Sequence, residues 1–91
     1  MPVRKTITLA GRTVTLSIGD LLKEPVDAIV NAANSNLAHG GGVAAVIARA
    51  AGPELDAESL ALVKRHGTVP TGDAAVTGAG KLPFRGVIHA V

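Results

Sequence analysis

The stretch DAIVNAANSNLAHGGGVAAVIARAAG, which runs from residue 27 to residue 52, decides the fold of this chain. A run of apolar residues that begins at Ala28 predicts a buried strand over Asp27–Ala32. An alanine-rich segment directly after a row of glycines predicts a helix over Gly42–Ala51. The end of a strand, a glycine-rich loop and the start of a helix are therefore expected to lie at one corner of the fold.

The groups at this corner suit a ligand that carries both hydroxyls and phosphates. Asn31 and Asn34 have side-chain amides that donate and accept hydrogen bonds, which matches a ribose diol. Gly40, Gly41 and Gly42 have no Cβ atoms, so a ligand can approach the backbone closely. A helix start leaves its first N–H groups unpaired and carries about half a positive charge, which suits a diphosphate.

The composition excludes several classes of protein. The 91 residues suffice for one small domain, and 47% of them are apolar, which argues against a disordered chain. Phe84 is the only aromatic residue, so the base-stacking surface of single-strand binders is absent. The net charge of +2 is small and the basic residues are scattered, which disfavours a nucleic-acid partner.

The sequence also gives no sign of a membrane, metal or cofactor partner. No apolar run approaches the roughly 18 residues of a transmembrane helix, and the N-terminus has no signal-peptide core, so we expect a cytoplasmic protein. The absence of cysteine excludes disulfides and thiol catalysis. His39, His66 and His89 do not have the spacing of metal ligands, so we expect no metal and no cofactor. We expect His39 to be a loop residue without a catalytic role and His89 to be packed in a central strand.

The rest of the chain predicts further strands and a second helix. The strands are expected at Thr6–Ala10, Thr13–Ile18, Gly72–Thr77 and Gly86–Val91, and the helix from Pro53 to about His66. The pair Gly11-Arg12 suits the central positions of a hairpin turn. The apolar face of the first helix is expected to consist of Val43, Val46, Ile47 and Ala50. This pattern of strands and helices indicates the α/β class.

Several motifs follow one another from about Thr6 to the end of the chain. They are Ile18-Gly19-Asp20-Leu21, the run from Val26 to Asn34, Gly40-Gly41-Gly42-Val43, Ala50-Ala51-Gly52, Gly72-Asp73-Ala74 and the run from Val87 to Val91. This ordered set resembles the macrodomain family, whose members bind ADP-ribose. The resemblance implies a three-layer α/β/α fold with a mixed sheet. It places residues 1–91 in the N-terminal portion of a single such domain, with elements in the order β-β-β-α-α-β-β.

The resemblance also implies a set of site residues. The ligand-binding set is Asp20, Leu21, Asn31, Ala33, Asn34, Gly41, Gly42 and Val43. By resemblance, the Asp20 carboxylate accepts a hydrogen bond from the adenine amino group, and the Leu21 N–H assists. The amide of Asn34 contacts the distal ribose and is the candidate catalytic group. The loop at Gly41–Val43 binds the diphosphate through backbone N–H groups.

Each of these residues also has a purely structural interpretation. Asp20 could cap a turn or a helix, Asn34 could satisfy the backbone of its own loop, and the glycines could form a flexible linker. Asn31 is as well explained by holding the loop in shape as by touching a ligand. The segment Gly40–Ala45 additionally fits a permissive G-x-G-x-x-A dinucleotide fingerprint. However, a Rossmann turn follows its strand almost at once, whereas here a long segment intervenes.

Two functional classes remain open, a binding module for free or protein-linked ADP-ribose and a hydrolase. The hydrolase would remove ADP-ribose from acidic side chains or deacetylate O-acetyl-ADP-ribose. In hydrolytic members of the family an aspartate that assists a water often follows the Gly-Gly-Val segment. In this sequence Ala44 occupies that position, so one candidate general base is missing.

The resemblance implies that the C-terminal strands and the second phosphate loop of the family are absent from residues 1–91. The family's sheet order places the missing strands between the opening hairpin and the strand at Asp27–Ala32. We therefore expect exposed strand edges, which invite pairing with a complementary chain or a second copy. A fragment without ligand activity of its own is the alternative.

Overall fold

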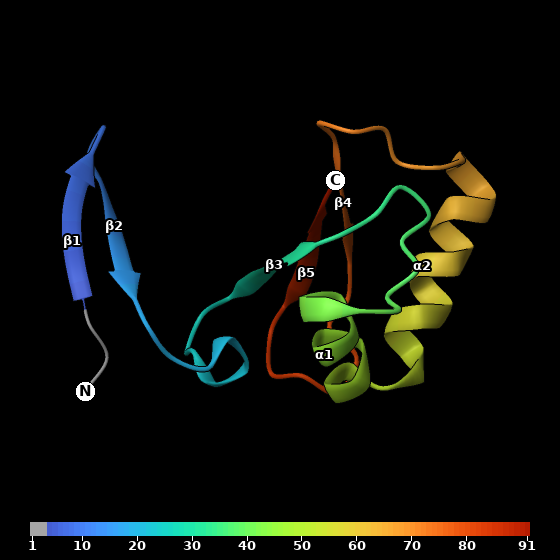
Figure 1. The fold of residues 1–91 in the computed structure, drawn as a ribbon, viewed down its shortest axis with the longest axis horizontal. Helices are drawn as coiled ribbons and strands as arrows, with labels where there is room; N and C mark the ends of the chain where they lie inside the picture. Colours follow the sequence, from blue (N-terminus) through green and yellow to red (C-terminus); the bar gives the residue numbers. More distant parts are fainter. Residues whose placement is uncertain (1–3) are drawn as a thin grey trace.

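The computed structural model describes residues 4–91, which form two separate sheets and two main helices (Figure 1). The elements in chain order are β1 (Arg4–Leu9), β2 (Arg12–Ser17), the short 3₁₀ helix η1 (Leu21–Lys23), β3 (Ala28–Ala32), α1 (Gly42–Ala51), α2 (Pro53–His66), β4 (Ala74–Thr77) and β5 (Gly86–Ala90). This order confirms the predicted succession of strands and helices.

The larger sheet is mixed and has the order β3-β5-β4. The central strand β5 runs parallel to β3 and antiparallel to β4. Its register with β3 pairs Asn31 with His89, and its register with β4 pairs Ala75 with the same histidine. The α/β class and the mixed sheet are therefore confirmed, and His89 lies in a central strand as predicted.

Both helices pack on one face of this sheet. Side chains alternate along β3, so Ile29 and Asn31 are buried while their neighbours are exposed. The core cluster consists of Ile29, Ile47, Ala48, Ala51, Leu55, Ala79, Phe84 and Val87. On the opposite face, Val30 and Val76 flank Ile88 in one cross-strand row, and Val30 is 56% exposed. The described residues therefore form two layers, the sheet and the helices on one of its faces.

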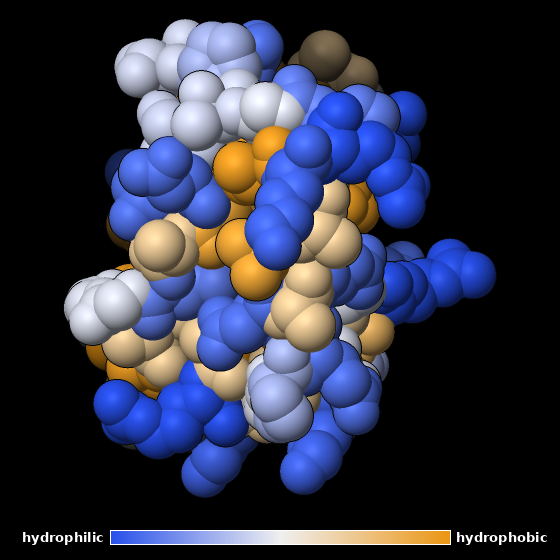
Figure 2. Space-filling view, turned by 90° about the vertical axis from the view of Figure 1, so that its right-hand side faces the viewer, coloured by the Kyte–Doolittle hydropathy of each residue, from blue (hydrophilic) through white to orange (hydrophobic). Residues whose placement is uncertain are grey.

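The two helices end where the sequence predicts. Gly52 ends α1 with a φ of +88°, and Pro53 occupies the first turn of α2. Gly67 ends α2 with a φ of +85°. The outer face of the molecule that carries α2 is dominated by hydrophilic side chains (Figure 2), as expected for a helix with one apolar stripe.

The predicted buried face of α1 is largely wrong. Of the four residues expected there, only Ile47 is buried, while Val43 and Val46 are each 51% exposed and Ala50 is exposed. The buried residues are instead Ala44, Ile47, Ala48 and Ala51. Small alanine side chains let the helix axis approach the sheet and α2 closely, and this outweighs the greater apolar area of the valines.

The hairpin turn also differs from the prediction. Leu9 pairs with Arg12, so the central residues are Ala10 and Gly11 rather than Gly11 and Arg12. Both have positive φ, at 50° and 75°. Such a turn matches the twist of the flanking strands, and glycine at its second central position adopts the positive φ without strain.

The hairpin of β1 and β2 stands apart from the rest of the fold (Figure 1). Every residue of β2 is exposed, and the apolar side chains of Leu16 and Ile18 are each 69% exposed. Within the part of the chain that the structure describes, the two strands pair only with each other. The site described below is therefore built by η1, β3, α1 and the loops between them.

Candidate functional site

Two cavities flank the N-terminus of α1. The first has a volume of about 430 Å³ and is lined by Asp20, Leu21, Leu22, Gly42, Val43, Val46 and Ile47. The second has a volume of about 470 Å³ and is lined by Ala32, Ala33, Asn34, Ala38, Gly40, Gly41 and Ala44. Because Gly41 and Gly42 are consecutive, one helix start separates a carboxylate-bearing cavity from an amide-bearing one.

Asp20 closes one side of the first cavity and also caps η1. One of its carboxyl oxygens accepts a hydrogen bond from the Leu22 N–H at 3.0 Å. The structural interpretation of Asp20 as a helix cap is therefore correct. A carboxylate accepts more hydrogen bonds than this one, so the capping role leaves acceptor capacity for a ligand. The exposed Val43 and Val46 add apolar surface to the same cavity.

Asn34 uses its amide to fold its own loop. The Nδ2 group donates to the Ala38 carbonyl at 2.8 Å, and Oδ1 accepts from the Ala38 N–H at 3.0 Å. One N–H and one lone pair of this exposed amide remain for another partner. The local bonds therefore hold the amide in a fixed orientation at the second cavity.

The glycines leave open space at the helix start. A Cβ atom built on Gly40, Gly41 or Gly42 would meet nothing within 4 Å. Gly42 has a φ of +59°, which other residues rarely adopt, and Gly41 caps α1 without a side-chain hydrogen bond. The first N–H groups of α1 therefore point out of the helix without a capping group, as an anion site requires.

Two of the four alanines that line the second cavity, Ala33 and Ala44, differ in exposure. Ala33 follows β3, and its N–H donates to the Ala90 carbonyl at 3.0 Å, which ties the start of the loop to β5. Ala44 is buried against the core but still lines the cavity. A small side chain is thus present where an aspartate would reach into the second cavity.

Asn31 is not on the surface of either cavity. Its side chain is fully buried, and its Nδ2 lies 3.0 Å from His89 Nδ1 and 3.4 Å from His39 Nδ1. Its Oδ1 has no hydrogen-bond partner among the described residues. The sequence suggested either a structural role or a ligand contact for Asn31. The observed hydrogen bonds are those of a structural role, although they join Asn31 to histidine side chains and not to the backbone of the loop.

The two histidines stack, with ring centroids 5.0 Å apart. Burial and the charge of His39 lower the pKa of His89 to about 4, and the negative charge of Glu58 opposes this shift. Burial also lowers the pKa of His39, and Asp56 opposes this shift. Both rings are therefore neutral at pH 7.

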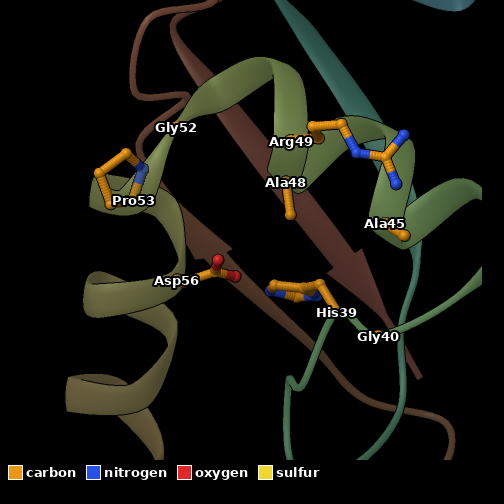
Figure 3. Close-up of a pocket in the computed structure, with 8 residues that line it drawn as sticks. All are labelled: His39, Gly40, Ala45, Ala48, Arg49, Gly52, Pro53 and Asp56. Atoms are coloured by element: carbon orange, nitrogen blue, oxygen red, sulfur yellow. The ribbon is translucent and has the colours of Figure 1, made fainter.

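His39 also lines a third cavity, of about 480 Å³, between the loop, α1 and α2. Figure 3 shows the carboxylate of Asp56 directed toward the His39 ring and Arg49 on the opposite helix. Gly40 lines both this cavity and the second one. His39 is thus placed between the proposed ligand corner and the core.

Other kinds of site are not found in the part of the chain that the structure describes. Within residues 4–91, no three histidine, aspartate or glutamate side chains gather in a way that could hold a metal ion. Over the same residues, no helix has both the length and the apolar character needed to cross a membrane.

Sequence reasoning missed the partners of the buried histidines. His39 Nε2 lies 3.0 Å from Ser59 Oγ, and His89 Nε2 lies 2.9 Å from Thr77 Oγ1. The partners come from distant segments, so local spacing contains no signal for them. One signal was present for Ser59, which follows Leu55 by one helical turn and is therefore a polar residue within the apolar stripe of α2.

Comparisons with known proteins agree with this arrangement. The family model described as Macro domain matches residues 30–91. Over 80 residues the chain is 49% identical to O-acetyl-ADP-ribose deacetylase 1 of Pantoea vagans, covering 88% of this chain and 47% of that protein.

Solved structures show the same likeness. A macrodomain of Oceanobacillus iheyensis with ADP superposes with a TM-score of 0.90 at 36% identity, over 100% of this chain and 50% of the other. A Trypanosoma brucei macrodomain in complex with ADP-ribose has a TM-score of 0.70 at 40% identity, over 80% of this chain and 30% of the other. The chain thus spans about half, or less, of the length of these relatives.

Proposed function

The chain belongs to the Macro domain family, and we propose that it binds ADP-ribose across the N-terminus of α1. The observation that carries this proposal is the pair of cavities on the two sides of one helix start. The length of ADP-ribose, with a base at one end and a ribose at the other, suits two such cavities with a diphosphate between them. Relatives whose structures contain ADP and ADP-ribose support the choice of ligand.

Each part of the ligand has a matching group in this arrangement. The adenine occupies the first cavity, where Val43 and Val46 cover its faces and Asp20 accepts from its amino group. The diphosphate meets the unpaired N–H groups at Gly42, where the helix dipole favours negative charge. The distal ribose lies in the second cavity, beside the free N–H and lone pair of Asn34.

Calorimetric titration with ADP-ribose, and with AMP as the shorter ligand, tests this proposal. We expect binding that prefers ADP-ribose, because AMP cannot reach the second cavity. Gly42→Glu should abolish the preference, since the new side chain adds negative charge at the diphosphate and strains a φ of +59°. Asn34→Ala should weaken binding, whereas Asn36→Ala, in the same loop, should not. Equal affinities for the two ligands would contradict the proposal.

Hydrolysis is a second candidate activity, supported by the likeness to an O-acetyl-ADP-ribose deacetylase. Asn34 would orient the distal ribose for attack by water. Because Ala44 offers no base, the water would have to be positioned by other groups, such as a substrate phosphate, and we expect slow turnover. Release of ADP-ribose from a glutamate-linked substrate tests this. Equal release by the original protein and by Asn34→Ala would leave binding as the only function.

We further propose that another polypeptide segment, from a complementary chain or a second copy, supplies strands beside β2 and β3. Each of these strands is at an edge of its sheet, and apolar side chains at Leu16 and Val30 are exposed. Sedimentation over a range of concentrations tests the second-copy form of this proposal. Association should grow with concentration, and a monomer with a sharp unfolding transition at every concentration would contradict it. An isolated chain that binds no ADP-ribose would support the alternative of a fragment that is inactive by itself.

A further inference from the structure

A continuous row of polar side chains runs beneath the glycine-rich loop, from α2 through the sheet to β4. It begins at Ser59, passes through His39, Asn31 and His89, and ends at Thr77. The side chains of all but His39 are buried, and the distances between partners are 3.0, 3.4, 3.0 and 2.9 Å in that order. Four of the five residues belong to strands or helices, and only His39 belongs to the loop.

The direction of the hydrogen bonds in this row follows from its β4 end. The hydroxyl of Thr77 donates to the Gly78 carbonyl at 2.9 Å, so its oxygen accepts from Nε2–H of His89. Nδ1 of His89 is then unprotonated and accepts from the amide N–H of Asn31. The second N–H of the same amide points to Nδ1 of His39, which leaves Nε2–H of His39 to donate to Ser59.

Among residues 4–91, Asn31 is therefore the only donor to these two ring nitrogens, and one orientation of its amide satisfies both. The orientation is retained although it leaves Oδ1 buried without a partner among the described residues. A buried carbonyl without a donor is costly, so the bonds to the two histidines must outweigh that cost. The amide thus fixes the tautomer of His39 and supports the tautomer that Thr77 imposes on His89.

The row has a mechanical consequence for the loop that runs from Ala33 to Gly41. The loop is held at its start by the bond from Ala33 to β5, and in its middle by the burial of Leu37. Near its end, His39 supplies the hydrogen bonds that tie the side chains of the loop to α2 and β3. Gly40 and Gly41 follow directly and line the second cavity.

We propose that Asn31 and Ser59 are positioning residues, which act through His39 to hold the loop of Gly40 and Gly41 in the shape that receives the ligand. The proposal rests on the proposed binding of ADP-ribose for its functional meaning, but its structural part stands without the ligand. Neither residue lines the two ligand cavities. Ser59 lies on α2, and Asn31 lies under the loop with no exposed surface.

Nitrogen NMR of the histidine rings tests the structural part. The chain has three histidines, and His66 at the exposed end of α2 is an internal control. At pH 7 we expect His39 and His89 to be neutral with the proton on Nε2. Ser59→Ala removes the acceptor at His39 and should change the His39 signals while leaving those of His66 unchanged. A mixture of tautomers at His39 and His89 in the original protein would overturn the proposal.

Asn31→Asp gives an independent test with little change of side-chain volume. A carboxylate only accepts hydrogen bonds, so it should move a proton to Nδ1 of both buried rings and raise their pKa. The His66 signals should again be unchanged. Unaltered His39 and His89 signals in this variant would show that the amide does not set the tautomers, and the proposal would fail.

The functional part is tested with Ser59→Ala, because alanine suits a helix and the fold should be retained. Loss of one hydrogen bond that holds the loop should weaken ADP-ribose binding about two- to tenfold and speed amide hydrogen exchange between Ala33 and Gly41. Glu54→Ala, on the exposed start of α2, is the matched control and should change neither. Unchanged affinity and unchanged exchange in Ser59→Ala would overturn the proposal. Absence of binding in the original protein would refute the proposed function alone, since hydrogen exchange still reports on the loop.

Discussion

The strands of the hairpin contain fewer apolar residues than those of the helix-covered sheet, and the two regions also differ completely in burial. All residues of β2 are exposed, whereas β3 and β5 bury alternate side chains under α1 and α2. The whole core cluster lies in the second region. The comparison teaches that β-branched residues form strands in both places, but only a covering layer turns a strand into a source of stability.

The largest expected effect comes from the core under α1. Ile47 is 1% exposed and belongs to the core cluster, so Ile47→Ala should lower the free energy of unfolding by about 2–5 kcal/mol. Chemical denaturation monitored by far-UV circular dichroism measures this. Ile7→Ala in the hairpin is the matched control and should cost far less because the side chain is half exposed. Equal losses would show that the hairpin is packed in solution.

Two glycines with positive φ, one in each region, provide a second test of the difference in packing. A Cβ at Gly80 would lie 2.4 Å from the Ala51 carbonyl oxygen, whereas a Cβ at Gly11 would meet nothing within 4 Å. Gly80→Ala should therefore cost about 2–4 kcal/mol from strain and overlap together, and Gly11→Ala about 1–2 kcal/mol from strain alone. Thermal unfolding of both variants measures the difference. A larger loss for Gly11→Ala would reverse the comparison.

The sequence predicted the bounds of the two helices better than it predicted which face of α1 is buried. Local rules found the bounds of α1 and α2, because Gly52, Pro53 and Gly67 act through their own backbone preferences. The buried face of α1 was mispredicted because the sequence shows that Val43 and Val46 are apolar but not that they face a cavity. Their exposure depends on the distant η1 segment, which no local pattern encodes.

In the candidate site, too, some features could be predicted from the sequence and others could not. The loop glycines and Asn34 could be found from the sequence, since they sit between a strand and a helix in chain order. The partners of His89 could not, because Asn31 lies 58 residues away along the chain and reaches the ring only through the parallel pairing of β3 with β5. Contacts of this kind depend on the order and direction of the strands in the sheet. The resemblance to the macrodomain family implies that order, whereas the periodicity of the sequence does not.

Acidification should weaken only the covered region. The pKa of His89 falls from 6.5 to about 4 in the folded state, mainly because burial disfavours its charged form. The unfolded chain therefore binds more protons between these values. The stability that depends on neutral His89 is fully present above pH 6.5 and is lost as the pH falls toward 4, by up to about 3 kcal/mol from this group. Urea unfolding at pH 7 and pH 4.5 measures this loss. His66→Gln should keep the dependence, and His89→Gln should reduce it.

The smallest effect on the isolated chain is expected in the hairpin, and it tests whether another chain covers β2. Leu16 is exposed on an edge strand, so Leu16→Ser should change the free energy of unfolding by about 0.5 kcal/mol or less in a dilute monomer. If strands of another chain pair with β2, the same substitution should weaken that association, because Leu16 would then be buried. Sedimentation of the original protein and of Leu16→Ser at matched concentrations separates these effects. A loss of stability in the dilute monomer comparable to that of Ile47→Ala would mean that the hairpin folds back onto the core, and the contrast between the two regions would disappear.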